Sequence, residues 1–228
     1  MSDEVLDETI EDGETLRLVK RGEQLVVLSG DTVLFGESRR REDRAFAEFA
    51  LAPLAGRDDL VITLAGLGTG RLLRAVLDFP GVREVDVVER SPAVLRWARS
   101  HFAVGSGGAV LDPRVSVRVG EVLSMVSAAD APTGRFGVLL DLDDTLESAR
   151  NAAVYADDGL VKLASTLRGG GVLALASTRK EPQLLSFLST HMQNVAQIAA
   201  PVDTEPGALD FFYRARRPAA AKATPGRN

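Results

Sequence analysis

Apolar residues in this chain form strand-like runs that alternate with helix-like segments. Residues 60–65 and 84–88 are almost continuously apolar or β-branched, and residues 71–79 between them have helical spacing. Similar strand-like runs follow at residues 115–119, 136–141, 171–177, 195–200 and 209–214, and helices are predicted at residues 91–102, 122–129, 153–167 and 182–192. A strand that is apolar on both sides must be covered on both faces. The pattern therefore predicts a parallel sheet between two layers of helices.

The two ends of this pattern differ from its middle. No helix is predicted between the last two strands, and a loop as short as residues 203–207 joins antiparallel neighbours. Before the first core strand, residues 15–20, 24–28 and 32–35 form short β-prone runs, followed by an amphipathic helix at residues 42–54. The predicted fold is a doubly wound, mostly parallel seven-stranded α/β sheet with a small N-terminal β meander.

Charge is distributed unevenly along the chain. The formal net charge is −5, yet the first fourteen residues carry seven acids and no base. We therefore expect an acidic flexible leader at residues 1–14, the meander and helix at 15–58, a nucleoside-binding domain at 59–216, and a flexible tail at 217–228 that is rich in Ala, Pro and Gly.

Composition excludes several classes of site. The chain has no cysteine and only two histidines, which excludes disulfides and thiolate chemistry and argues against a metal centre. No stretch approaches the ~18 apolar residues of a membrane helix, and the start lacks the pattern of a signal peptide. No broad basic surface suggests nucleic-acid binding. We expect a cytoplasmic protein without a metal, membrane or nucleic-acid partner.

A glycine-rich loop and an acid indicate a nucleoside site. Gly66, Gly68 and Gly70 lie where the first core strand turns into its helix, and Glu89 ends the next strand, nineteen residues after Gly70. Glycines let a ligand approach the backbone, and a carboxylate at that strand end accepts hydrogen bonds from ribose hydroxyls. After Glu89, Ser91-Pro92 is typical of a helix start. Arg71 stands where a dinucleotide-binding loop has its third glycine, which disfavours a nicotinamide oxidoreductase.

Two further acids follow strands of the same sheet. Gly120-Glu121 comes after the third core strand, and Asp141 ends the fourth. Ligands of open α/β sheets bind beyond the carboxyl ends of the strands, so these acids are expected to converge with Gly68 and Glu89. The neighbouring Asp143 is interpreted as the cap of a turn.

From residue 34 to residue 177 the chain resembles the spermidine synthase (polyamine aminopropyltransferase) family of the class I methyltransferase-like fold. The resemblance is carried by Gly66-Leu67-Gly68-Thr69-Gly70, Val87-Val88-Glu89, Asp112-Pro113-Arg114-Val115, Gly120-Glu121, Asp141 to Asp144, Tyr155 and Gly169 to Leu173. It implies that the loop of Gly66, Gly68, Thr69 and Gly70 lies beside the sulfonium chain of the donor. It also implies Glu89 on the ribose, Glu121 near the adenine amine, Asp141 as the base for an attacking amine, and Asp144 as a second carboxylate.

The chain departs from this family at four points, one of which is a shorter N-terminal β region. The family has an acid where Thr69 stands, and that acid holds the aminopropyl ammonium of decarboxylated S-adenosylmethionine. A Tyr-His-Glu segment of the family is replaced by Phe46-Ala47-Glu48, and a proline after the second carboxylate by Thr145. These departures favour S-adenosylmethionine itself as the donor.

Three functions therefore remain open. The preferred hypothesis is a spermidine synthase-like transferase that moves a methyl group from S-adenosylmethionine to a nitrogen or oxygen of a small molecule. The alternatives are aminopropyl transfer from decarboxylated S-adenosylmethionine and a non-catalytic nucleoside-binding or regulatory homologue. The partner is a small-molecule acceptor, with an amine among the candidates. A homodimer and the identity of the acceptor stay open.

Overall fold

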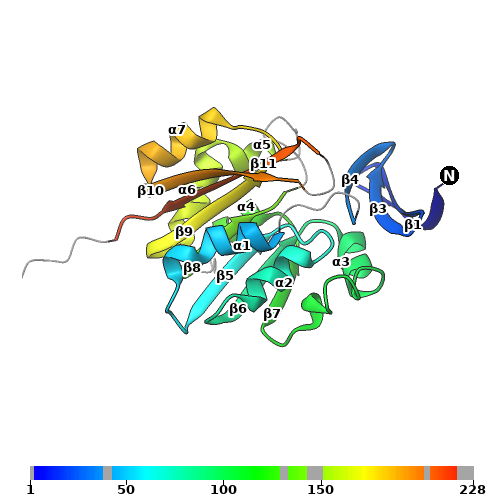
Figure 1. The fold of residues 1–228 in the computed structure, drawn as a ribbon, viewed down its shortest axis with the longest axis horizontal. Helices are drawn as coiled ribbons and strands as arrows, with labels where there is room; N and C mark the ends of the chain where they lie inside the picture. Colours follow the sequence, from blue (N-terminus) through cyan, green and yellow to red (C-terminus); the bar gives the residue numbers. More distant parts are fainter. Residues whose placement is uncertain (1–2, 38–42, 129–132, 143–150, 203–205, 220–228) are drawn as a thin grey trace, which may run out of the picture.

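The chain forms two β-sheets, one large and one small (Figure 1). The computed structural model describes residues 3–37, 43–128, 133–142, 151–202 and 206–219. Within these ranges a mostly parallel seven-stranded sheet carries helices on both faces, and a four-stranded antiparallel sheet stands beyond one end of it. The fold class predicted from the apolar pattern is confirmed.

The larger sheet has the strand order β10-β11-β9-β8-β5-β6-β7. Its parallel part consists of β5 (Leu60–Ala65), β6 (Val82–Glu89), β7 (Val115–Val119), β8 (Arg135–Leu140) and β9 (Leu167–Ser177). The strand β11 (Leu209–Arg216) pairs antiparallel with β9 and with the edge strand β10 (Gln193–Pro201). The antiparallel pair predicted at this end of the chain is confirmed.

Helices cover the two faces of this sheet in separate groups. One face carries α1 (Asp43–Leu51), α2 (Arg71–Asp78) and α3 (Pro92–Arg99), and the other carries α4 (Val122–Ser127), α5 (Ala152–Tyr155), α6 (Asp157–Thr166) and α7 (Pro182–His191). Short 3-10 helices lie at η1 (Ala52–Leu54) and η2 (Ala109–Leu111). In β9, Val172 and Ala174 pack in one core cluster, and Leu173 and Leu175 pack in the other. Burial on both faces explains why residues 172–176 are apolar without interruption.

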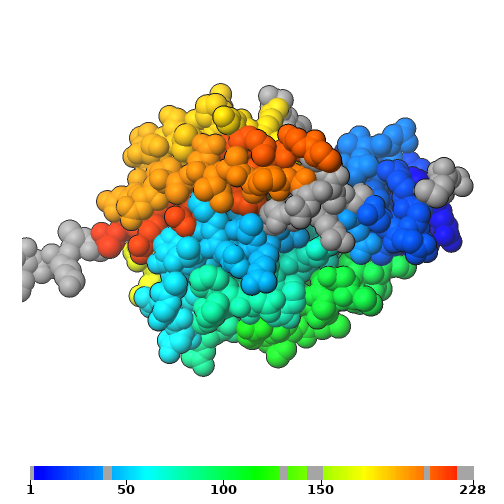
Figure 2. Space-filling view, in the orientation of Figure 1, coloured from blue at the N-terminus to red at the C-terminus, as the bar shows by residue number. Residues whose placement is uncertain are grey.

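The smaller sheet is an antiparallel meander with the order β1-β2-β3-β4. Its strands are β1 (Glu4–Glu11), β2 (Glu14–Arg21), β3 (Gln24–Ser29) and β4 (Thr32–Gly36). The meander predicted at β2 to β4 is confirmed. Hydrophobic side chains join this sheet to the main core, because Leu18 and Phe35 share a cluster with Val94 and Phe102. In the space-filling view the blue surface of the meander adjoins the body of the molecule (Figure 2).

The prediction of a flexible leader at residues 1–14 is wrong for β1. The acids of this segment are paired with cations that lie far away in sequence, and these pairs compensate the charge that suggested flexibility. The ion pairs join Asp3 to Arg21 at 2.7 Å, Asp7 to Arg96 at 3.1 Å, and Asp12 to Arg90 at 3.2 Å. The proposed division at residue 58 stays a prediction, and residues 220–228 of the expected tail lie outside the described residues.

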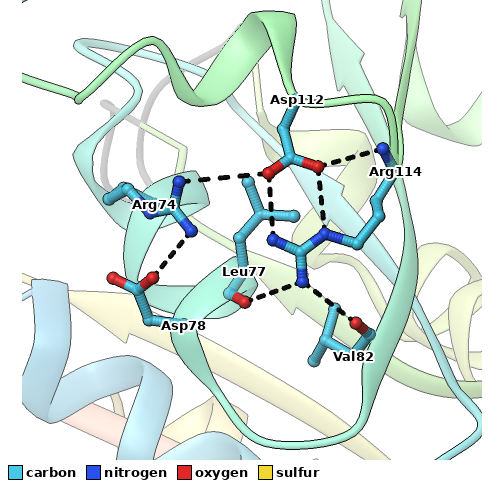
Figure 3. A network of polar contacts seen from close by, with 6 residues as sticks. All are labelled: Arg74, Leu77, Asp78, Val82, Asp112 and Arg114. Atoms are coloured by element: carbon cyan, nitrogen blue, oxygen red, sulfur yellow. Dashed lines mark hydrogen bonds and ion pairs between the residues drawn. The ribbon is translucent and has the colours of Figure 1, made fainter.

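Arg114 ties the start of β6 to the end of α2 (Figure 3). Its guanidinium donates to both carboxylate oxygens of Asp112 at 2.9 Å, and to the carbonyls of Leu77 at 3.0 Å and Val82 at 3.2 Å. Arg74 approaches the same carboxylate at 4.0 Å. These contacts, and chiefly the hydrogen bonds from Arg114, lower the pKa of Asp112 to about 2. The Asp112 to Val115 motif thus has a structural role at a junction of three elements.

Candidate functional site

The carboxyl ends of the central parallel strands lie at one edge of the sheet. The backbone amides of Gly66, Gly120 and Asp141 each donate to a carbonyl in one of the last two residues of a neighbouring strand, at 2.9 Å in every case. A pocket opens at this edge, and its lining includes Gly66, Glu89, Glu121 and Asp141. The structure therefore brings together four of the residues singled out in the sequence.

Gly66 is required by the close approach of β8 to the loop. Its φ is +91°, and a Cβ atom at this position would lie 2.1 Å from the carbonyl oxygen of Asp141. The other three loop residues predicted to hold the donor, Gly68, Thr69 and Gly70, lie farther along the turn. Gly70 precedes α2, and its amide donates to the carbonyl of Leu67 at 2.8 Å. The described lining includes Gly66 but not Gly68, Thr69 or Gly70. Donor binding by these three residues stays a prediction.

Glu89 is a buried acid at the end of β6. Its Oε2 accepts a hydrogen bond from the amide of Leu67 at 2.9 Å, and its Oε1 accepts one from the amide of Ser91 at 2.8 Å. Burial raises the pKa of Glu89 despite these hydrogen bonds. Each carboxylate oxygen has a second lone pair, so the group retains acceptor capacity for two ligand hydroxyls.

The start of α3 forms one wall of the site. Ser91 caps the helix by accepting a hydrogen bond from the amide of Val94 at 3.0 Å, which confirms the helix start predicted from Ser91-Pro92. The preceding amide, that of Ala93, donates to Glu11 at 2.9 Å. A strand of the N-terminal sheet thus reaches the helix that borders the pocket.

Several lining residues were not found by sequence reasoning. Glu11 ends β1 and Asp12 lies in the turn after it, and the others include Leu16, Leu34, Phe35, Arg90, Asn151 and Val154. A signal for the turn was present, because Asp12-Gly13 between two alternating runs is typical of a two-residue hairpin. Both turn residues have the positive φ that such a turn requires, 51° and 80°.

The pocket is strongly acidic. Five carboxylates line it, those of Glu11, Asp12, Glu89, Glu121 and Asp141, against the single described cation Arg90. Such a lining favours cationic ligands, since a positive charge in the pocket is stabilised by the surrounding acids. Within the described part of the chain, no cluster of three or more side chains suits a metal ion. None of the described helices is long and apolar enough to cross a membrane.

Two predictions concerning the amine side of the site have different outcomes. Asp141 lines the pocket, whereas the second predicted carboxylate, Asp144, lies outside the described residues together with Asp143 and Thr145. Phe46, which stands in the segment that differs from the family, is buried in the core, with its ring centroid 5.0 Å from that of Phe212.

Comparisons with known proteins give polyamine aminopropyltransferases among the relatives of this chain. No protein-family model matches the chain. Polyamine aminopropyltransferase 2 of Streptomyces coelicolor is 31% identical over 176 residues, which cover 72% of this chain and 31% of the relative. The polyamine aminopropyltransferase of Aeropyrum pernix is 30% identical over 152 residues, which cover 65% of this chain and 46% of the relative. The chain thus spans less than half the length of these two relatives.

Solved structures of similar fold include spermidine synthases. The enzyme from Thermotoga maritima matches with a TM-score of 0.75 at 16% identity, covering 94% of this chain and 73% of that one. A spermidine synthase in complex with the transition-state analogue AdoDATO matches with a TM-score of 0.73 at 15% identity, over 94% and 72% of the two chains. At these identities the match shows a shared fold.

Proposed function

Since this chain is a spermidine synthase-like protein with the class I methyltransferase-like fold, we propose that it is an aminopropyltransferase. Its substrates are decarboxylated S-adenosylmethionine as the donor and a small-molecule amine as the acceptor. The methyl transfer favoured in the sequence analysis has no support from the relatives, which are named polyamine aminopropyltransferases. The expected donor changes accordingly from S-adenosylmethionine to its decarboxylated form.

The acidic lining of the pocket is the observation that carries this proposal. Decarboxylated S-adenosylmethionine has a sulfonium and an ammonium group and no carboxylate, so it is a dication near neutral pH. S-adenosylmethionine adds a carboxylate, which five nearby acids repel. An amine acceptor is also cationic before reaction. Both substrates of aminopropyl transfer therefore suit the charge of this pocket.

This charge also weakens the argument from Thr69. An acid at position 69 would offset the desolvation of the aminopropyl ammonium, which threonine cannot do. The acids that line the pocket come instead from other elements, among them Glu11 at the end of β1 and Asp12 in the turn after it. A threonine in the loop is therefore compatible with a cationic donor.

The proposed mechanism is an in-line displacement. Glu89 holds the ribose hydroxyls and Glu121 lies near the adenine amine, so that the donor's sulfonium faces Asp141. Asp141 accepts the proton of the acceptor amine, whose nitrogen then forms a bond to the methylene carbon beside sulfur. The carbon–sulfur bond breaks, its electron pair stays on sulfur, and neutral methylthioadenosine leaves. Positioning and a general base contribute to the rate, the base by about 10²- to 10⁴-fold.

The test compares donors and then turnover. Calorimetry of the wild type should show tighter binding of decarboxylated S-adenosylmethionine than of S-adenosylmethionine, and Thr69→Asp should widen this preference. Mixing the decarboxylated donor with diamines should release methylthioadenosine. Tighter binding of S-adenosylmethionine would contradict the proposal.

A non-catalytic homologue is the second candidate, because Phe46 lies in the core where the family has part of its polyamine segment. Nucleoside binding without release of methylthioadenosine over a panel of amines would favour this alternative. Asp141→Asn separates the two hypotheses further, since it should reduce turnover in an aminopropyltransferase while leaving methylthioadenosine affinity within about threefold.

A further inference from the structure

We infer that Arg90 contacts the purine base of the bound nucleoside, and that Asp12 and Glu121 hold its guanidinium in position. The β1–β2 turn would then take part in nucleoside recognition. This inference rests on the proposed function only in taking a purine nucleoside as the ligand. It concerns a residue and a strand that the sequence analysis left without a role.

Arg90 lies between two acids at the rim of the pocket. Its Nη2 donates to Asp12 Oδ2 at 3.2 Å, and its Nε lies 3.5 Å from Glu121 Oε1. All three residues line the pocket, and one third of the Arg90 side chain, 34%, is exposed. Arg90 also follows Glu89 directly, so it extends from the same strand end as the acid expected to bind ribose.

A guanidinium held in this way is suited to a flat, neutral partner. Its plane stacks on aromatic faces, and it is more weakly hydrated than an ammonium group. The two acids on its edge satisfy donors and restrict rotation, which reduces the entropy lost when a base binds. A purine over Arg90 would also bring its exocyclic amine toward Glu121, a carboxylate that accepts hydrogen bonds.

The strand that supplies Asp12 is itself fixed on α3. Asp7 accepts hydrogen bonds from Trp97 Nε1 at 2.7 Å and from Arg96 at 3.1 Å, which lower the pKa of Asp7. Glu11 accepts from the amide of Ala93 at 2.9 Å. The β1–β2 turn is therefore anchored by contacts other than that of Asp12. These contacts hold the Asp12 carboxylate in place beside Arg90.

The experiment measures binding of methylthioadenosine, a neutral nucleoside, by calorimetry. A neutral probe separates contact with the base from the general charge of the pocket. Arg90→Ala should weaken binding by about tenfold, since cation–π contacts contribute about 1 kcal/mol and more when desolvated. Arg90→Lys keeps the charge without the plane and should recover less than half of the lost binding free energy. Asp12→Asn should weaken binding by about threefold.

Arg96→Ala is the matched control. It removes an ion pair that joins β1 to α3, close in sequence to the pair of Asp12 and Arg90, but Arg96 does not line the pocket and Trp97 still holds Asp7. Its affinity for methylthioadenosine should stay within twofold of the wild type. An equal loss in Arg96→Ala and Arg90→Ala would assign the effect to docking of β1 and overturn the inference.

Further results would also overturn the inference about Arg90. Unchanged binding in folded Arg90→Ala would remove Arg90 from the base site, and tighter binding would show that Arg90 occupies the space of the ligand. Failure of the wild type to bind any nucleoside would instead refute the proposed function itself, and this inference with it. Wild-type binding that is lost in Glu89→Ala but kept in Arg90→Ala would refute only the inference.

Discussion

The carboxylate of Glu89 accepts a hydrogen bond from the backbone amide of Leu67 at 2.9 Å, although the two residues are 22 positions apart. The acid expected to bind ribose therefore also fixes the glycine-rich loop that follows β5. Its other oxygen accepts from the amide of Ser91 and so fixes the start of α3. Ligand binding and local structure consequently depend on the same side chain.

We expect Glu89→Ala to reduce both nucleoside affinity and stability. The affinity for methylthioadenosine should fall by about 2 to 4 kcal/mol, because charge-assisted hydrogen bonds to ribose are lost. The free energy of unfolding should fall by about 1 to 3 kcal/mol, because two buried amides lose their acceptor. Calorimetry and urea denaturation measure the two effects. Glu84→Ala, which removes an exposed acid from the same strand, serves as the control and should change neither. Full affinity in folded Glu89→Ala would remove this residue from the site.

Nucleoside affinity should decrease with decreasing pH because of Glu89. Burial raises its pKa above the ordinary 4.5, and the ionised carboxylate is a stronger hydrogen-bond acceptor on both oxygens than the protonated acid. Affinity for neutral methylthioadenosine should therefore fall as the pH drops through this raised pKa. A raised pKa also means that the protonation-dependent part of the Glu89 contribution to folding stability is fully present below pH 4.5 and is lost as the pH rises through the folded value, whereas the hydrogen bonds to the two amides remain. Calorimetry from pH 4.5 to 8, with circular dichroism to confirm folding, tests the first effect. A flat profile in Glu89→Gln and a sloping one in the wild type are expected, and two flat profiles would contradict the prediction.

Asp112→Asn should destabilise the fold without a direct effect on the pocket. The hydrogen bonds from Arg114 lower the pKa of Asp112 from 3.8 to about 2, so the ionised form is favoured in the folded protein. The stabilisation of the fold by ionised Asp112 is therefore present above pH 3.8 and is lost as the pH falls toward about 2. At pH 7 the variant should lose about 2 kcal/mol in urea denaturation. The exposed Asp58→Asn should lose less than about 0.5 kcal/mol. Equal stability of the two variants would show that the contacts in Figure 3 contribute little.

Alanine substitutions at Gly66 and Gly68 should differ in cost. At Gly66 the new Cβ would lie 2.1 Å from the carbonyl oxygen of Asp141, so the end of β8 must move. At Gly68 the nearest atom is in the ring of Phe35 at 3.9 Å, and only the φ of +50° is unfavourable. We expect a loss of about 3 kcal/mol or more for Gly66→Ala and about 1 to 2 kcal/mol for Gly68→Ala. Thermal unfolding measures both, and a larger loss at Gly68 would contradict the geometry.

The large sheet could be predicted from sequence because each of its central strands is buried on both faces. Burial makes residues such as Val172 to Leu175 apolar without interruption, and this local pattern needs no knowledge of distant partners. The start of α3 could also be predicted from a local signal, since Ser91 caps the helix by accepting a hydrogen bond from a residue three positions away. Because parallel strands end at the same edge of the sheet, the positions of Glu89, Glu121 and Asp141 at strand ends predicted that they lie at that edge.

The position of β1 and its share of the pocket could not be predicted, because they depend on contacts between residues far apart in sequence. The acids of β1 suggested a flexible segment because their partners Arg90 and Arg96 lie 78 and 89 positions away. With that strand set aside, Glu11 and Asp12 could not be assigned to the pocket. The donor preference inferred from Thr69 differs from the proposed one for the same reason, since most of the acids that line the pocket come from other elements.

The anchoring of β1 on α3 has a consequence for the order of folding. The β1–β2 hairpin is local and can form early, whereas its contacts with Ala93 and Trp97 close loops of 82 and 90 residues. The contacts of β1 with α3 are few and polar, and no side chain of β1 is fully buried, so their separation exposes little apolar surface. We expect β1 to dock on α3 after the parallel sheet has formed and to lose these contacts at a lower free energy than global unfolding. The nucleoside wall would then be the last part of the pocket to assemble, and bound nucleoside should slow amide exchange in β1.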